Sequence, residues 1–171
     1  MTEKSGKLLS DLDQSLDELI KVYRSLLNLI RNEKEILISS NLEELEKSNR
    51  SKEAILQKLR KTDEARQKVA KELAESEGLD PELTRLLDFS KHFGGAEGDR
   101  LRKLHSVLDL LLTRIQEINQ NNEVLVKVAL DNVTGGISNI KEALSENKVY
   151  KKGGAVQTTP AESGQLVRRQ V

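Results

Sequence analysis

The chain has 171 residues, in which 28 Lys and Arg balance 28 Asp and Glu, so its formal net charge is zero. Balanced charge argues against a nucleic-acid binder or a polybasic membrane-surface protein, and the lack of cysteine excludes disulfides and thiolate metal sites. A composition with 33% charged and only 2% aromatic residues indicates long helices packed through aliphatic side chains. No apolar signal segment opens the chain, and no apolar run reaches the ~20 residues of a membrane span. We therefore expect a cytoplasmic protein without stable membrane insertion.

The first periodic segment predicts a helix from about Ser5 to about Ser39. Steps of three and four residues separate its apolar positions, as in a coiled-coil seam, and Glu33 is the one polar break. A second apolar set widens this face, as expected for a helix that meets more than one partner. The seam is Leu9, Leu12, Leu16, Leu19, Tyr23, Leu26, Ile30 and Leu37, and the second set is Leu8, Ile20, Leu27 and Ile38.

A second helix is predicted to begin after Asn41, because Asn41 and Glu44 are spaced like a capping box. It should run to about Glu77, with Gly78 as its stop signal. The centre of this helix is polar, so we expect thinner packing than in the first. Its apolar residues are Leu42, Leu45, Ile55, Leu56, Leu59, Val69 and Leu73.

Asp80 and Pro81 predict a short third helix, from about Pro81 to His92, that ends at Gly94-Gly95. The stretch GGAEGD is expected to be a loop. The longest periodic run follows and stops at Asn119–Asn122. Its seam is Leu101, Leu104, Leu108, Leu111, Ile115 and Ile118.

Beyond the asparagines, an amphipathic helix is predicted at about 121–146, with its apolar stripe shifted by one residue from the earlier seam. Such a shift is typical of a stutter and should turn the apolar face. Gly135-Gly136 weakens this helix. Core packing and a binding surface both remain open, but low local stability is typical of elements that rearrange on binding. The stripe is Val126, Leu130, Val133, Ile137, Ile140 and Leu144.

Residues 147–171 show no periodicity and are rich in Gly, Ser and Thr, which predicts a flexible, disordered tail. We therefore expect an all-α fold, an elongated antiparallel helical bundle or coiled coil of three long helices plus one short helix. The helical domain should cover residues 1–146 and the tail residues 147–171.

Neither histidine belongs to a metal-binding or catalytic pattern. His92 falls near a helix end and His105 beside a leucine seam, without an HExxH motif or carboxylates at ligand spacing. The glycine-containing stretches lack GxxxxGK[ST] and a preceding strand, so they do not match phosphate loops. We expect no enzyme, cofactor or metal.

Three features together resemble the FlgN family of flagellar export chaperones: EKEIL…SNLEELEKSNRSKEAILQKL, then NNEVLVKVALDNVTGGISNIKEAL, then Tyr150 with glycines and a final QLVRR. The resemblance covers nearly the whole chain, and its C-terminal third is the distinctive part. It implies that the chain holds hook-associated subunits, which form the hook–filament junction, and delivers them to the type III export apparatus. It also implies that the 126–144 stripe binds this cargo and that Tyr150 docks to the cytoplasmic domain of the export gate.

Two other interpretations of the stripe stay open at the level of sequence. It could mediate permanent self-association, such as a homodimer, in a structural coiled-coil adaptor. It could also lie on a membrane surface, although it carries few basic residues for that role.

Overall fold

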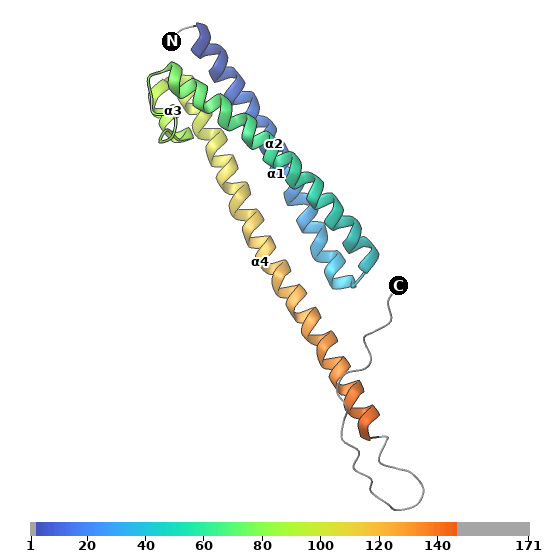
Figure 1. Ribbon diagram of the computed structural model, residues 1–171. Helices are drawn as coiled ribbons and strands as arrows, with labels where there is room; N and C mark the ends of the chain where they lie inside the picture. Colours follow the sequence, from blue (N-terminus) through green and yellow to red (C-terminus); the bar gives the residue numbers. More distant parts are fainter. Residues whose placement is uncertain (1–2, 147–171) are drawn as a thin grey trace, which may run out of the picture. The chain divides into compact units, whose positions relative to one another are not determined.

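The computed structural model describes residues 3–146 as four helices with no strand among them (Figure 1). The helices are α1 (Glu3–Ser39), α2 (Leu42–Ser76), α3 (Leu86–Phe93) and α4 (Gly95–Glu146). The predicted all-α fold with three long helices and one short one is confirmed, whereas the predicted tail lies outside the described residues. The chain divides into two compact units, residues 1–127 and 128–171, and the helical packing described below belongs to the first.

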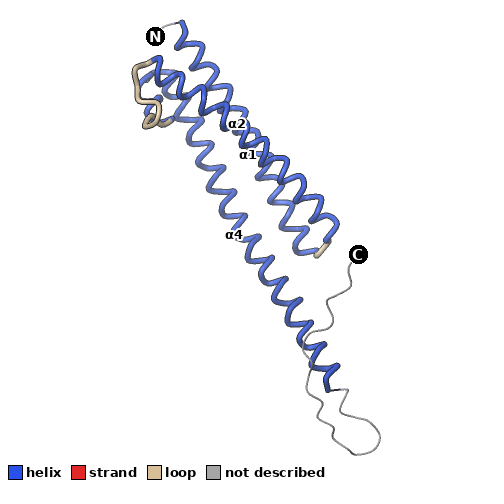
Figure 2. Tube along the Cα trace, in the orientation of Figure 1, coloured by secondary structure: helices blue, strands red, loops and turns tan. Residues whose placement is uncertain are grey.

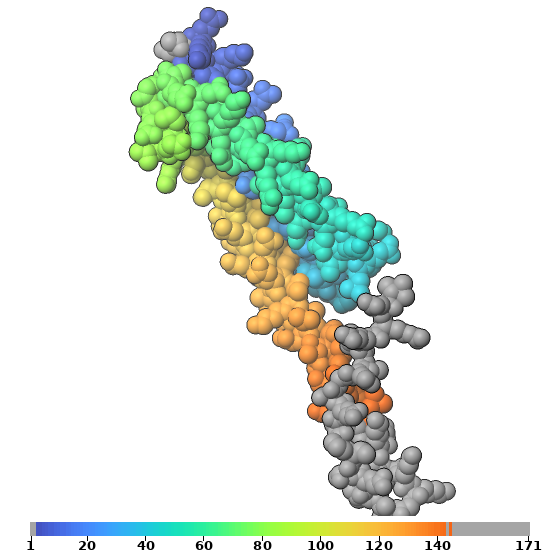
Figure 3. Space-filling model, viewed as in Figure 1, coloured from blue at the N-terminus to red at the C-terminus, as the bar shows by residue number. Residues whose placement is uncertain are grey.

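The turn between α1 and α2 forms as the sequence predicts. Ser40 takes a left-handed conformation with φ of 55°. The Asn41 side chain then accepts a hydrogen bond of 3.2 Å from the backbone N–H of Glu44. This cap satisfies one of the free N–H groups at the start of α2. The two helices therefore form an antiparallel hairpin whose surfaces pack side by side (Figures 2 and 3).

The end of α2 is predicted correctly, but the start of the third helix is not. Gly78 has φ of 69° and terminates the helix. Pro81 does not begin a helix, because the Asp80 side chain and backbone close a single turn with Glu82 and Thr84. The helix begins five residues later, where the Asp88 carboxylate accepts the N–H of Arg85 at 3.0 Å.

The stretch GGAEGD is helical from Gly95 onward rather than a loop, which corrects the prediction. Gly94 and Gly95, with φ of 61° and 50°, make the corner, and α4 begins at Gly95. Gly98 lies so close to α3 that an added Cβ would be 2.3 Å from the carbonyl oxygen of Ser90. Only glycine permits this approach, so Gly98 fixes the corner between α3 and α4.

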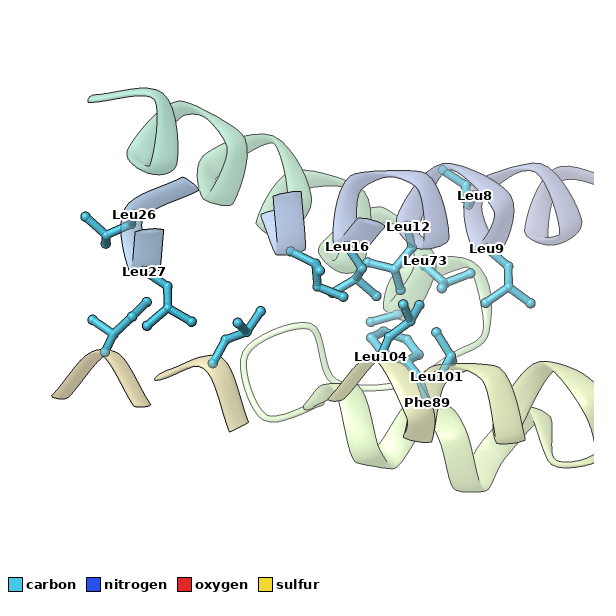
Figure 4. Close-up of a cluster of buried hydrophobic side chains, with 14 of the residues drawn as sticks. Leu8, Leu9, Leu12, Leu16, Leu26, Leu27, Leu73, Phe89, Leu101 and Leu104 are labelled. Atoms are coloured by element: carbon cyan, nitrogen blue, oxygen red, sulfur yellow. The ribbon is translucent and has the colours of Figure 1, made fainter. Parts of the chain in front are cut away.

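The hydrophobic core lies between α1, α3 and the first part of α4, with α2 contributing less (Figure 4). Leu12, Leu16 and Phe89 are almost fully buried. Of the large aliphatic residues on α2, only Leu73 is fully buried, whereas Leu42 is 78% exposed. The expected thin packing of α2 is therefore confirmed.

A buried polar layer joins α1, α2 and α4 within this unit. Glu33 is 6% exposed, and both of its carboxylate oxygens accept from Lys52 Nζ, at 2.5 and 2.6 Å. Asn122 donates to the Ile30 carbonyl at 2.9 Å and to Glu33 at 3.3 Å. Glu33, the polar break in the seam of α1, is therefore the hydrogen-bond partner of Asn122, which lies near the end of the seam on α4.

Ser48 Oγ and Asn122 Oδ1 are buried in this unit without a hydrogen-bond partner among the described residues. An unsatisfied buried polar group costs free energy. The polar layer therefore stabilises the bundle less than an apolar layer of the same volume would, and such layers are known to fix helix register instead.

Replacing Lys52 by Met should lower the free energy of unfolding by roughly 3 kcal/mol, because it leaves the Glu33 carboxylate buried without a counter-charge. Urea unfolding followed by circular dichroism measures the change. The matched control is Lys47→Met on the same helix, where Lys47 pairs with Glu43 at 2.7 Å and both side chains are mostly exposed to solvent. This control should leave the unfolding midpoint almost unchanged.

The double variant Glu33→Leu/Lys52→Met should recover most of the lost stability, because it removes the buried charge together with its partner. If Lys52→Met unfolded at the same urea concentration as Lys47→Met, the Glu33–Lys52 pair would not behave as a buried ion pair. The account of the buried polar layer would then be wrong.

Candidate functional site: the apolar face of α4

All six residues of the predicted stripe are exposed on α4. Their exposed fractions are 49% for Val126, 63% for Leu130, 60% for Val133, 50% for Ile137, 61% for Ile140 and 62% for Leu144. At about 100° per residue, these side chains fall within roughly 80° of one helix face. The helix therefore presents a continuous aliphatic stripe to solvent, which is unusual for a monomeric soluble chain.

Two further exposed valines were missed by the sequence interpretation. Val124 is 61% exposed and Val128 is 50% exposed. They are four residues apart and lie on roughly the opposite face from the stripe. Their i, i+4 spacing was the available signal, and they add apolar surface on a second side of the helix.

The core side of α4 ends at the asparagines. Asn122, 5% exposed, is the last buried residue of α4 within the described part of the chain. Leu125 is half-buried, and the exposed stripe starts at Val126. The side chains of α4 therefore change from buried to exposed just after the asparagines, whereas the predicted turn of the apolar face stays a prediction.

Within the described part of the chain, no steric contact requires glycine at Gly135 and Gly136, in the middle of the stripe. A Cβ added at Gly135 or Gly136 would meet nothing within 4 Å, and neither glycine has a positive φ. Thr134 donates to the Leu130 carbonyl at 2.8 Å, a bond that slightly weakens a helix. The helix continues through these residues, so the glycines lower its stability without breaking it.

Neither His92 nor His105 belongs to the stripe. His92 Nε2 is 2.9 Å from Glu77 Oε2, which ties the end of α3 to the end of α2. A hydrogen bond from Ser5 and the contact with His92 hold the pKa of Glu77 below its ordinary value. His105 is half-buried in α4. Among residues 3–146, no group of three or more His, Asp or Glu side chains could hold a metal ion.

Two further observations concern membrane spans and Tyr150. No helix in the described range is long and apolar enough to cross a membrane. Tyr150, predicted to dock to the export gate, lies outside the described residues.

Comparison with known proteins bears on the whole arrangement. Searches of curated proteins and of solved structures gave no match. The family model described as FlgN protein matches residues 1–158, which include every described helix and the entire apolar stripe. The match confirms the resemblance seen in the sequence: the chain belongs to the FlgN family of flagellar export chaperones.

Proposed function

We propose that this chain is a cytoplasmic chaperone that binds hook-associated subunits through the exposed stripe of α4 and delivers them to the type III export apparatus. The observation that carries this proposal is the exposure of all six stripe residues, from Val126 to Leu144, in a chain of the FlgN family. In this proposal the chain acts by binding alone, without catalysis or a cofactor.

The physical basis of the proposal is helix-on-helix recognition. Export subunits offer amphipathic terminal helices that would be disordered alone, and such helices bind by laying their apolar face against another apolar surface. Binding to the stripe would cover the apolar faces of the terminal helices and keep the subunits from assembling too early.

The expected affinity is moderate. Fully burying an aliphatic side chain contributes about 1.5–3 kcal/mol. Because each stripe residue is already about half covered, the six together would contribute on the order of 6 kcal/mol. The ordering of cargo and α4 offsets part of this gain. A chaperone that must release its cargo requires such a limited surplus.

Docking to the export gate forms a separate part of the proposal. Tyr150 follows the cargo-binding helix closely in the sequence, which would place gate recognition next to the bound subunit. This role rests on the family resemblance and on the position of Tyr150 in the chain.

The Ile137→Asp variant should weaken binding of the purified hook-associated subunits at least about tenfold, because a carboxylate would be buried in an apolar contact. Isothermal titration calorimetry measures the affinity. Since Ile137 is half exposed in the free chain, helicity and melting temperature should stay unchanged. The control is Ser138→Asp, which adds the same charge away from the stripe and should bind normally.

Two results would contradict the cargo-binding proposal. Loss of helicity or early melting of Ile137→Asp would show that the stripe is a core face. A tight homodimer in sedimentation experiments that ignores hook-associated subunits, and that Ile137→Asp dissociates, would show that the stripe serves self-association instead.

Replacing Gly135 and Gly136 with Ala should stabilise the helix by about 1 kcal/mol at each position. Amide hydrogen exchange across residues 130–144 should slow accordingly. Cargo should bind up to about tenfold more tightly and leave more slowly, because less of the helix remains to be ordered on binding.

The matched control for the glycine pair is Gly98→Ala, which should destabilise the bundle because its Cβ would clash with the Ser90 carbonyl. Unchanged exchange in the Gly135→Ala/Gly136→Ala variant would mean that the glycine pair does not soften this helix.

A further inference from the structure

A pocket of about 270 Å³ lies between α1, α2, α3 and the loop before α3, within residues 1–127, and no stripe residue lines it. Its apolar lining consists of Leu12, Ala70, Pro81, Leu86 and Phe89. Ala70, Pro81 and Leu86 are partly exposed, whereas Leu12 and Phe89 are buried. Leu12 and Phe89 belong to the hydrophobic core, so the pocket adjoins the buried part of the bundle (Figure 4). Its size suits one large apolar side chain of a partner.

The charged groups that line this pocket are all cationic. Arg66 and Lys71 lie on α2, and Arg85 is the residue that precedes α3. No Asp or Glu lines the pocket. Carboxylates do lie nearby: Asp63 pairs with Arg66 at 2.8 Å and Glu82 pairs with Lys71 at 2.6 Å.

Both arginines keep hydrogen-bond donors available. Arg66 uses only its Nε in the ion pair with Asp63, whose second oxygen is bound by Gln67 at 2.7 Å. Arg85 is exposed, and Asp88 binds its backbone N–H rather than its guanidinium. Since a guanidinium carries five N–H donors in a planar fork, these two side chains can each hold a carboxylate with two hydrogen bonds.

We propose that this pocket binds a segment of a partner protein that presents a large apolar side chain directly next to a carboxylate. The apolar side chain would contact the partly exposed Ala70 and Leu86, and the carboxylate would bind Arg85 and Arg66. The pocket shares no residue with the cargo-binding stripe, so the chain would recognise a second protein segment while α4 holds its cargo.

The test uses the full chain labelled with ¹⁵N and the peptide acetyl-Glu-Leu-Phe-Glu-amide as the probe. Titration followed by NMR should shift the amide signals of Ala70, Leu86 and Phe89 in a saturable manner. The counterpart acetyl-Gln-Leu-Phe-Gln-amide, which has the same shape but no charge, should bind at least about tenfold more weakly. Arg85→Glu should weaken binding of the acidic peptide to a similar degree.

Two control variants give the experiment its specificity. Arg31→Glu makes the same charge change as Arg85→Glu, but at an exposed position on α1 that does not line the pocket. It should leave peptide binding unchanged. Ile137→Asp should also bind the peptide normally, so failure of the cargo proposal and failure of this one are distinguishable.

Three outcomes would overturn the proposal: no saturable shifts at the pocket, equal binding of the acidic and neutral peptides, or equal binding by Arg85→Glu and Arg31→Glu. A homodimer that Arg85→Glu dissociates would also overturn it, because a second copy of the chain would then occupy the pocket.

Discussion

The buried carboxylate of Glu33 is the constraint on which the arrangement of the bundle depends. A carboxylate that is 6% exposed requires a counter-charge and hydrogen bonds, and here α2 supplies Lys52 while α4 supplies Asn122. These partners can meet only when the three helices lie in one relative register. Leucine seams alone tolerate a shift by one heptad, whereas a polar contact at a single layer does not. The layer therefore gives up some stability and sets where α4 lies along α1 and α2.

The same layer marks where α4 changes its role. Its side chains are buried at intervals from Leu101 to Asn122, and the six residues of the stripe, from Val126 to Leu144, are exposed. A single helix thus combines a segment that stabilises the fold with a segment that has aliphatic surface to offer a partner. Gly135 and Gly136 lie in the second segment, where no contact within the described chain requires them. This division is consistent with a chaperone that keeps its binding helix less stable than its scaffold.

Much of the fold could be predicted from local signals, because helix periodicity, the Asn41 cap and the Gly78 stop act within a few residues. The start of α3 could not, because Asp80 is satisfied by a single turn and Asp88 provides a competing cap at Arg85. The pairing of Glu33 with Lys52 and Asn122 was beyond reach for another reason: these partners are 19 and 89 positions away in sequence. Periodicity identified the stripe at Val126–Leu144, yet only side-chain burial distinguishes an exposed stripe from a core seam.

Hydrogen exchange along α4 tests the central claim, that this helix is divided near Asn122, most directly. In the free chain, amides of residues 101–118 should exchange slowly and those of residues 128–144 should exchange much faster. Addition of a hook-associated subunit should slow exchange in the second group and leave the first unchanged. Equal protection of both groups without cargo would contradict the account, since the stripe would then be part of the stable core.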